Sequence, residues 1–364
     1  MSSGAGTLRV GIVGGGFMAR THAHAARAAG AHVEAILSSA PDRTAQAAAE
    51  LAVPHAAASL EELIDRVDVV HVCSPNRWHL EQSLAVIGAG THVVCEKPLA
   101  TTAADAVRLV GAAGGVVATV PFVYRFHPMA REARARVAAG DIGRMLTLRG
   151  SYLQDWLLEP GEQNWRVDPV AGGASRAFGD IGSHLVDLLE FVAGDRIARI
   201  AARTQTAYPE RAGSTVTTED AVAVVVETAG GAIGSLLVSQ VAAGRKNALT
   251  IEVSGSAGAI AFDQEHPDEL WLGGRDASRV LSRDAGVLST DAARLSVVPS
   301  GHPMGYLDAF TAFARDTYAA VRGEEPGGLP RFADGARAAV LTEAVLAAAV
   351  EDRWIDIPSE GATT

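Results

Sequence analysis

The segment Val10–Ala19 reads Val-Gly-Ile-Val-Gly-Gly-Gly-Phe-Met-Ala, and the prediction of the fold starts from it. A short apolar run leads into a glycine turn of the pattern Gly-x-Gly-x-x-Ala, at Gly14, Gly16 and Ala19. Gly14 permits the tight turn, and Gly16 lets the backbone approach a pyrophosphate that the next helix holds at its N-terminus. The segment therefore predicts the first strand, turn and helix of a dinucleotide-binding domain.

Apolar runs alternate with helix-like stretches along the first third of the chain. The stretches are rich in alanine, glutamate and arginine, as in Thr44–Leu51 and Leu80–Ala89. Strands separated by helices pair in parallel, because each return path is a crossover. Residues 1–123 are therefore predicted to form a Rossmann domain with a doubly wound parallel sheet. Its strands are expected at Leu8–Val13, His32–Leu37, Asp68–Cys73, Thr91–Cys95 and Gly115–Val120.

The pattern changes after Arg125. A helix is predicted over Pro128–Ala139, and longer β-rich runs follow it. Glycine-containing turns at Ala229–Gly231 and Ser254–Gly258 are typical of hairpins. Residues 124–364 are therefore predicted to form a second α/β domain with a large, open, mostly antiparallel sheet, and the last helix is expected to pack back on the first domain. The strands are expected at Met145–Leu153, Ile197–Ala207, Asp220–Thr228, Ala232–Val241 and Ala248–Ser254, and the closing helices at Met304–Arg322 and Phe332–Glu351.

Composition limits the class of protein. The 364 residues carry a formal net charge of −11 without a cluster of lysine and arginine, which argues against a nucleic-acid or membrane partner. Two cysteines, Cys73 and Cys95, are too few for a disulfide framework or a zinc site, so no metal is expected. The low cysteine content also predicts that the protein works in a reducing cytoplasm. The N-terminus lacks the features of a signal peptide, and no apolar run approaches the ~18 residues of a membrane span. The end, Ser359–Thr364, is expected to fray.

The residues after the second predicted strand bear on the choice of cofactor. An acidic residue that binds the ribose of NAD is usual about 20 positions after the glycine turn. This chain has Ser38 and Ser39 there, with Arg43 nearby. Two hydroxyls and a guanidinium would not repel the 2′-phosphate of NADP. The sequence therefore permits NADP and does not exclude NAD, and a solvated residue at a helix start is an equally good interpretation of Arg43.

Two further motifs follow predicted strands. In Ser74-Pro75-Asn76, a small hydroxyl and a proline leave room for the ribose and nicotinamide of a cofactor, and His79 is expected to order this loop or cap the next helix. In Glu96-Lys97-Pro98, a lysine desolvated beside a cofactor could donate to a substrate oxygen. The alternative is an ion pair of Glu96 with Lys97 at the strand end. The proline fixes the turn, and a cis peptide bond would suit it.

Asp180 and His184 supply an acid and a base four residues apart, so on a helix they share a face. Histidine titrates near neutrality and suits a general base for an alcohol proton. Taken alone, the pair is better interpreted as a helix N-cap with a surface histidine.

Taken together and in order, these motifs resemble the Gfo/Idh/MocA family, which includes glucose–fructose oxidoreductase and inositol dehydrogenases. The resemblance extends to Tyr124-Arg125-Phe126-x-Pro128 and to Phe332-x-Asp334-Gly335, so it covers nearly the whole chain. A narrower similarity, in Tyr152–Trp156 and Asn164–Arg166, is to levoglucosan dehydrogenase-like sugar dehydrogenases, which oxidise a ring hydroxyl to a ketone. A departure at Ala171–Phe178 bears on the identity of the substrate rather than on the reaction.

The resemblance implies a Rossmann domain followed by an α/β domain, whose open sheet covers the nicotinamide and often forms the oligomer interface. It implies that Lys97, Asp180 and His184 are catalytic. It also implies that Trp165 and Arg166 contact the cofactor.

The sequence thus predicts an NAD(P)-dependent dehydrogenase that oxidises a secondary hydroxyl of a sugar, anhydrosugar or cyclitol, as a homodimer or homotetramer. His184 would take the hydroxyl proton, Lys97 would polarise the same oxygen, and Asp180 would orient His184 or the substrate. The alternatives are a glycoside-cleaving enzyme that uses transient oxidation by bound NAD, and a non-catalytic NAD(P)-sensing protein. The retained catalytic set argues against the sensor.

The candidate contacts form two sets. The cofactor set is Gly14, Gly16, Phe17, Met18, Ser38, Ser39, Arg43, Ser74, Pro75, Asn76, His79, Glu96, Lys97, Trp165 and Arg166. The substrate set is Lys97, Tyr124, Gln154, Trp156, Asp180, His184, Arg245, Lys246 and His302. A solvated hairpin tip is an equally good interpretation of Arg245-Lys246.

Overall fold

The computed structural model describes residues 6–162 and 164–358, and the expectation of a frayed Ser359–Thr364 lies outside them. The chain divides into two compact units. Unit 1 is the chain up to Val123 together with Tyr306–Arg337, and unit 2 is Tyr124–Gly305 together with the chain from Ala338 onward.

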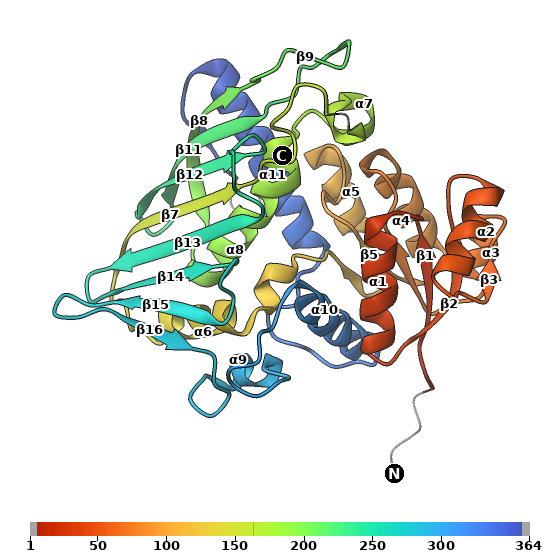
Figure 1. Ribbon diagram of the computed structural model, residues 1–364, viewed down its shortest axis with the longest axis horizontal. Coiled ribbons are helices and arrows are strands. Elements are labelled where there is room, and N and C mark those ends of the chain that lie inside the picture. The colour runs from red at the N-terminus through yellow and green to blue at the C-terminus, as the bar shows by residue number, and fades with distance from the viewer. Residues whose placement is uncertain (1–5, 163, 359–364) are drawn as a thin grey trace. The chain divides into compact units, whose positions relative to one another are not determined.

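Unit 1 contains a parallel six-stranded sheet in the order β3-β2-β1-β4-β5-β6 (Figure 1). Chain order reverses between β1 and β4, which are direct neighbours, and such a switch point is where nucleotides bind in open α/β sheets. Val10 and Ile12 of β1 are fully buried, as expected for a central strand with helices on both faces. The strands are β1 Arg9–Val13, β2 His32–Leu37, β3 His55–Ala56, β4 Val69–Val72, β5 His92–Cys95 and β6 Ala118–Thr119.

The helices of unit 1 follow the strands in alternation. Small residues let them lie close to the sheet, as Ala19, Ala23 and Ala26 do on the buried face of α1. Thr102 caps α5 by accepting a hydrogen bond from the backbone N–H of Asp105. The helices are α1 Phe17–Ala28, α2 Pro41–Glu50, α3 Leu60–Ile64, α4 His79–Gly88, α5 Ala103–Ala112 and α10 Tyr306–Val321.

The segment Tyr306–Arg337 differs from the expectation, because the sequence analysis placed it in the second domain. Its helix α10 packs against α1 and buries Phe310 and Phe313 there. Gly335 lies so close to Leu99 that an added Cβ would come within 2.9 Å of the leucine Cβ. The contacts that place this segment in unit 1 are therefore long-range, and the local sequence pattern does not predict them.

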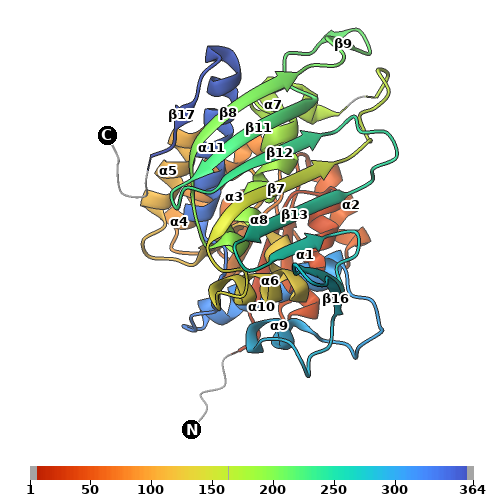
Figure 2. The same ribbon diagram turned by 90° about the vertical axis from the view of Figure 1, so that its left-hand side faces the viewer.

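Unit 2 contains a nine-stranded sheet in the order β16-β15-β14-β13-β7-β12-β11-β8-β17 (Figure 2). Strands β7 and β12 pair in parallel, and the other neighbours pair antiparallel. The two predicted glycine turns connect β11 to β12 and β13 to β14. The strands are β7 Met145–Leu153, β8 Ile197–Gln205, β11 Ala221–Thr228, β12 Ile233–Ser239, β13 Ala248–Gly255, β14 Ala259–Asp263, β15 Glu269–Gly273, β16 Arg279–Ser282 and β17 Ile355–Asp356, beside a separate hairpin of β9 Glu210–Arg211 and β10 Ser214–Thr215.

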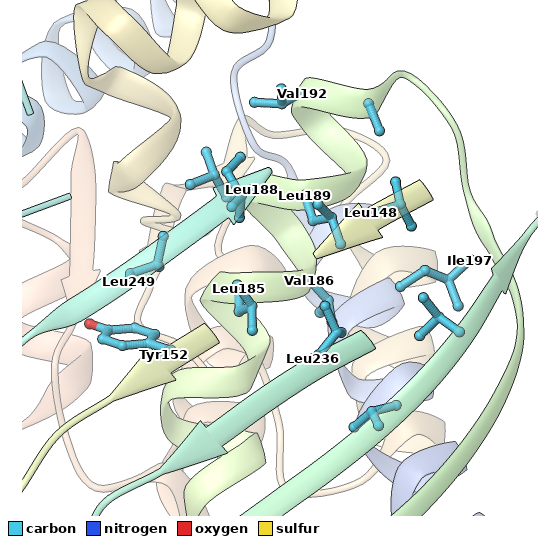
Figure 3. Packing of buried hydrophobic residues seen from close by; sticks show 14 of the residues in the cluster. Leu148, Tyr152, Leu185, Val186, Leu188, Leu189, Val192, Ile197, Leu236 and Leu249 are labelled. Carbon is cyan, nitrogen blue, oxygen red and sulfur yellow. The ribbon is translucent and has the colours of Figure 1, made fainter. Parts of the chain in front are cut away.

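Helices cover one face of this sheet, and the other face is turned toward the viewer in Figure 2. All residues of α8 are buried, and Leu185, Leu188 and Leu189 pack with Leu148 and Leu249 of the strands (Figure 3). The helices are α6 Pro128–Ala138, α7 Pro169–Gly172, α8 Ser183–Ala193, α9 Thr290–Leu295 and α11 Phe332–Glu351, and the last of these begins in unit 1 and ends in unit 2.

The predicted fold class is confirmed: a Rossmann sheet followed by an α/β unit with a large, mostly antiparallel sheet. Among the described residues, no helix combines the length and the apolar character that a membrane crossing needs.

Candidate active site

The glycine turn after β1 is built for close approach of a ligand to the backbone. Gly14 has a φ of 132°, and a Cβ there would lie 2.7 Å from the carbonyl oxygen of Cys73. A Cβ on Gly16 would meet nothing within 4 Å, so the space over the turn is open. Gly16 directly precedes α1, whose first N–H groups lack partners within the helix. An open glycine surface at the start of a 12-residue helix fits a pyrophosphate.

Polar but uncharged side chains follow β2. The backbone N–H of Ser38 donates to Thr44 Oγ1 at 2.9 Å, which fixes the loop at the start of α2. Arg43 is exposed, and its Nη1 lies 3.5 Å from Ser39 Oγ. A guanidinium beside Ser39 agrees with the expectation that a 2′-phosphate would not be repelled.

His79 joins two loops that follow β4 and β5. It is fully buried, its Nδ1 lies 2.7 Å from the carbonyl oxygen of Pro98, and its Nε2 lies 2.8 Å from that of Ser74. Burial lowers the pKa of His79, while Cys95 and the two carbonyls raise it, and the result is about 9. Both ring nitrogens face acceptors, so the imidazolium is the form that makes both hydrogen bonds. The expectation that His79 orders the loop is confirmed.

Lys97 follows β5 in a tight turn. The peptide bond from Lys97 to Pro98 is cis, as the motif suggested. Glu96 is buried, and its Oε2 accepts a hydrogen bond of 3.1 Å from the Lys97 backbone N–H. The other oxygen, Oε1, lies 2.9 Å from His22 Nε2. Glu96 therefore holds the main chain from which the Lys97 side chain extends.

In unit 2, Asp180 lies in a wider helical turn than expected. Phe178–Gly182 forms a single π-helical turn that continues into α8, in place of the regular α-helix assumed for the i, i+4 pair. A Cβ on Gly182 would lie 2.6 Å from the buried Phe178 ring, so only glycine fits there. Such turns occur frequently at functional sites.

Two polar side chains hold Asp180. Gln240 Nε2 donates to Asp180 Oδ2 at 2.9 Å, and Gln240 is fully buried. Arg166 Nε lies 3.4 Å from Asp180 Oδ1, and the Arg166 guanidinium lies over the Trp165 ring, 4.5 Å from its centroid. The predicted pair of Trp165 and Arg166 therefore helps to fix Asp180.

His184 lies against a pair of tyrosines. Its ring meets that of Tyr124 edge to face, with the centroids 5.0 Å apart. The Tyr124 and Tyr152 hydroxyl oxygens are 2.6 Å apart. Burial raises the pKa of Tyr124, against the hydrogen bonds from Tyr152 and Asn247 that lower it, so Tyr124 remains a neutral phenol at neutral pH.

Asn247 connects these tyrosines to the other predicted sugar contacts. Its Oδ1 accepts from Tyr152 at 2.7 Å and from Gln154 Nε2 at 2.9 Å, and its Nδ2 donates to Tyr124 at 3.2 Å. The indole N–H of Trp156 donates to Gln154 Oε1 at 2.7 Å. Unit 2 thus presents one connected set of hydroxyl, amide and indole groups that begins beside His184.

The loop that follows β7 and carries Trp156 is held by the side chain of Arg211. Arg211 donates to the carbonyl oxygens of Leu157 and Glu159 at 2.8 and 2.9 Å. The same guanidinium is paired with the buried carboxylate of Asp220 at 2.8 Å. A buried, charge-assisted anchor of this kind gives the loop one conformation.

Three other candidates lie apart from this set. Lys246 is 77% exposed and pairs with Asp155 at 2.8 Å, which is the main reason why the pKa of Asp155 is lowered. Arg245 is exposed in the same connection from β12 to β13, and His302 is exposed in the loop before α10. This connection is not a hairpin, because β7 lies between β12 and β13 in the sheet, but the exposure of Arg245 and Lys246 agrees with the solvated interpretation that the sequence left open.

Sequence reasoning missed Gln240 and Asn247, and it used Tyr152 only as part of a motif. Gln240 follows β12 and Asn247 precedes β13, at strand ends where no local pattern marks a polar side chain as functional. An amide next to an apolar strand was the one signal available.

Known proteins give a consistent result. The profile described as "Oxidoreductase family, NAD-binding Rossmann fold" matches residues 8–120, and that of the GFO/IDH/MocA C-terminal domain matches residues 130–261. Levoglucosan dehydrogenase from Pseudarthrobacter phenanthrenivorans is 31% identical over 96% of this chain and 98% of its own.

Solved structures agree with these matches. A levoglucosan dehydrogenase in complex with NADH and levoglucosan is 30% identical, with a TM-score of 0.91 over 97% of this chain and 100% of that one. An inositol dehydrogenase homologue with NAD+ from Azotobacter vinelandii is 28% identical, with a TM-score of 0.89 over 97% and 98%. The predicted resemblance is confirmed. This chain belongs to the GFO/IDH/MocA family, and it is an oxidoreductase with an NAD-binding Rossmann domain.

Proposed function

We propose that this enzyme oxidises a secondary hydroxyl of a sugar, anhydrosugar or cyclitol to a ketone. The observation that carries the proposal is the connected set of polar groups beside His184, formed by Tyr124, Tyr152, Asn247, Gln154 and Trp156. Neutral donors and acceptors on a rigid support suit a ligand with several hydroxyls. The relatives named for levoglucosan and inositol point to the same class of compound.

The residues divide the chemistry between them. Bound NAD(P) supplies the hydride acceptor for the carbon-bound hydrogen of the alcohol. His184 accepts the hydroxyl proton, and the Lys97 ammonium donates a hydrogen bond to the same oxygen as negative charge develops on it. Asp180, held by Gln240 and Arg166, orients His184 or the substrate. Each of these roles extends the sequence prediction and is open to direct test.

The test is a substrate panel with each cofactor. The enzyme is incubated with levoglucosan, myo-inositol, D-xylose or D-glucose and with NAD or NADP, and reduced nicotinamide is followed by absorbance. Net reduction with at least one compound supports a dehydrogenase. Cleavage of an added glycoside without net reduction would indicate the hydrolase, and cofactor binding without either would indicate the sensor.

Lys97→Ala tests the proposed role of Lys97, with a compound that the panel shows to be oxidised. Loss of the group that stabilises the developing alkoxide should lower kcat by roughly 100-fold or more, with little change in the KM for the cofactor. His24→Leu is the control, because His24 is an exposed residue of α1 with no role in the proposal. Full turnover by Lys97→Ala would contradict the assignment.

We further propose that the protein is a homodimer or homotetramer that associates through the open face of the nine-stranded sheet. Val225, Ile233, Leu237 and Trp271 are exposed there by 38–60%. A hollow lined by Ser151, Leu237 and Trp354, among others, opens on the same face. Several large apolar side chains on one sheet face are typical of an interface.

A further inference from the structure

Four buried side chains of unit 1 form a continuous hydrogen-bonded chain. His22 on α1 lies between Glu96 and His71, with its Nε2 2.9 Å from Glu96 Oε1 and its Nδ1 2.8 Å from His71 Nδ1. His71 on β4 lies in turn 3.1 Å, through its Nε2, from the hydroxyl of Tyr318 on α10. All four residues are at most 5% exposed. Chain separation is large, since residue 318 is 247 positions from residue 71.

The protons in this chain have one consistent arrangement. Burial, with a contribution from His22, holds the pKa of His71 well below its ordinary value, so His71 is neutral and has one N–H. Burial also raises the pKa of Tyr318, so its hydroxyl keeps its proton. Among the described residues, the only hydrogen-bond partner of that hydroxyl is His71 Nε2, which must therefore accept.

The positions of the remaining protons follow from the Tyr318 end of the hydrogen-bonded chain. If Nε2 of His71 accepts, its Nδ1 carries the proton and donates to His22 Nδ1. His22 then carries its own proton on Nε2 and donates it to Glu96 Oε1. The reverse arrangement would need a proton on Glu96 or a second proton on His22, and in either case it would leave the buried Tyr318 proton without an acceptor. Every hydrogen bond thus points toward the Glu96 carboxylate, whose other oxygen accepts from the Lys97 backbone N–H.

We propose that His22, His71 and Tyr318 are positioning residues for Lys97, because they hold the Glu96 carboxylate in the orientation that fixes the Lys97 main chain. The inference rests on the proposed role of Lys97 in the reaction. A buried carboxylate that loses one donor reorients, since an unmet acceptor in the interior is costly. The main chain it holds then moves, and small displacements of a reacting group have large effects on rate.

Histidine tautomers give a test that does not depend on activity. In protein labelled with 15N in its histidines, the ring nitrogens show which of them carries a proton, and His22→Gln and His71→Gln identify the two signals. We expect His71 to be protonated on Nδ1 and His22 on Nε2. Protonation of His71 on Nε2 would reverse the chain and overturn the inference.

Kinetics test whether the chain acts on Lys97. His22→Leu removes the donor to Glu96 and should lower kcat with a suitable alcohol from the panel by roughly 10- to 100-fold, with the KM for NAD little changed. His22→Gln keeps a side-chain N–H near the same position and should recover most of kcat. His24→Leu, two residues along the same helix but exposed, should match the wild type. Equal loss in His22→Leu and His22→Gln would show a packing effect and overturn the inference.

Tyr318→Phe covers the case in which His22→Leu fails to fold. It removes one oxygen, leaves the ring in place, and should release His71 to exchange between tautomers. An unchanged His71 tautomer and unchanged kcat would overturn the inference. Failure of the proposed function is distinguishable, because the wild type would then reduce no cofactor with any compound of the panel, and failure of the proposed role of Lys97 would leave Lys97→Ala with full turnover. If Lys97→Ala loses turnover and His22→Leu keeps it, only the positioning role is wrong.

Discussion

Two buried histidines of unit 1 are in opposite protonation states because of the atoms that face them. His79 faces two carbonyl oxygens, which only accept, and against the effect of burial Cys95 together with these carbonyls raises its pKa to about 9. His71 faces one donor and one acceptor, and burial with the nearby His22 lowers its pKa. In the sequence, His71 lies within an apolar run and His79 lies a few residues after it, and neither position indicates a protonation state, so the difference arises from tertiary neighbours.

His79 makes the stability of the protein depend on pH in a defined window. Its folded pKa of about 9 exceeds the unfolded value of 6.5, so folding takes up a proton between these values. The stabilisation is complete below pH 6.5 and is lost as pH rises through about 9. The difference in unfolding free energy between the wild type and His79→Leu should therefore depend on pH. It should be larger at acidic than at alkaline pH by on the order of 3 kcal/mol.

Denaturant titrations of both proteins on either side of this window check the prediction. His24→Leu, which removes an exposed histidine of the same unit, is the control for the loss of one histidine. A constant gap between the wild type and His79→Leu at all pH values would mean that folding leaves the pKa of His79 unchanged, and a gap that widens toward alkaline pH would mean that His79 is neutral in the folded protein.

Single residues were predictable where a motif marks them and not where partners are distant. The glycine turn, the cis proline and the loop role of His79 all follow from neighbours in the sequence. His22 is paired with Glu96 across 74 positions, and nothing local in the sequence suggests it. Gln240, which holds Asp180 across 60 positions, was missed for the same reason.

At the scale of elements, the π-helical turn at Phe178–Gly182 sets the direction of Asp180. An added Cβ on Gly182 would lie 2.6 Å from the Phe178 ring, which has no room to move because it is fully buried. Gly182→Ala should therefore destabilise the protein by about 1–3 kcal/mol, the usual cost of overpacking. It should also lower activity, because the turn carries Asp180.

The matched control is Gly179→Ala in the same turn, where an added Cβ would lie 3.4 Å from Ser175 Cβ. That variant should be neutral or more stable by up to about 1 kcal/mol, since alanine favours helix more than glycine does. Urea unfolding of both variants measures the contrast. Similar values for the two would show that Phe178 does not restrict the turn.

Elements with strong patterns were predicted well, and edge elements were not. Met145–Leu153 and Phe332–Glu351 have the bounds that the sequence predicts. Strands β14, β15 and β16 were not assigned, because short strands at a sheet edge alternate weakly and lie among polar turns. The π-helical turn was expected as ordinary α-helix, since spacing alone does not distinguish the two.

At the scale of the whole molecule, the open face of the nine-stranded sheet is the feature with the clearest consequence for assembly. Leu237 is 46% exposed on that face, on strand β12 next to the central strand β7. An arginine there would leave a charge in the proposed interface without a partner. Leu237→Arg should therefore reduce the mass of the protein in solution, measured by sedimentation at micromolar concentration.

Leu307 provides the comparison, because it is 45% exposed on α10 of unit 1. Leu307→Arg should keep the mass of the wild type. A wild type that sediments as a monomer, or a Leu237→Arg variant of unchanged mass, would show that this face is not the interface.

The path of the chain between the units bears on its synthesis. Unit 1 begins near the N-terminus, but its helix α10 and the residues to Arg337 come after most of unit 2. Many domains fold as soon as they leave the ribosome, at about 5–20 residues per second. Here the 182 residues from Tyr124 to Gly305 separate the two parts of unit 1, and their synthesis takes about 10–40 seconds at that rate. During this interval the nascent Rossmann sheet lacks α10. Because Tyr318 lies on α10, the buried hydrogen-bonded chain of His22, His71 and Glu96 also lacks its last member. The Glu96–Lys97 turn is thus completed only after most of unit 2 has been made.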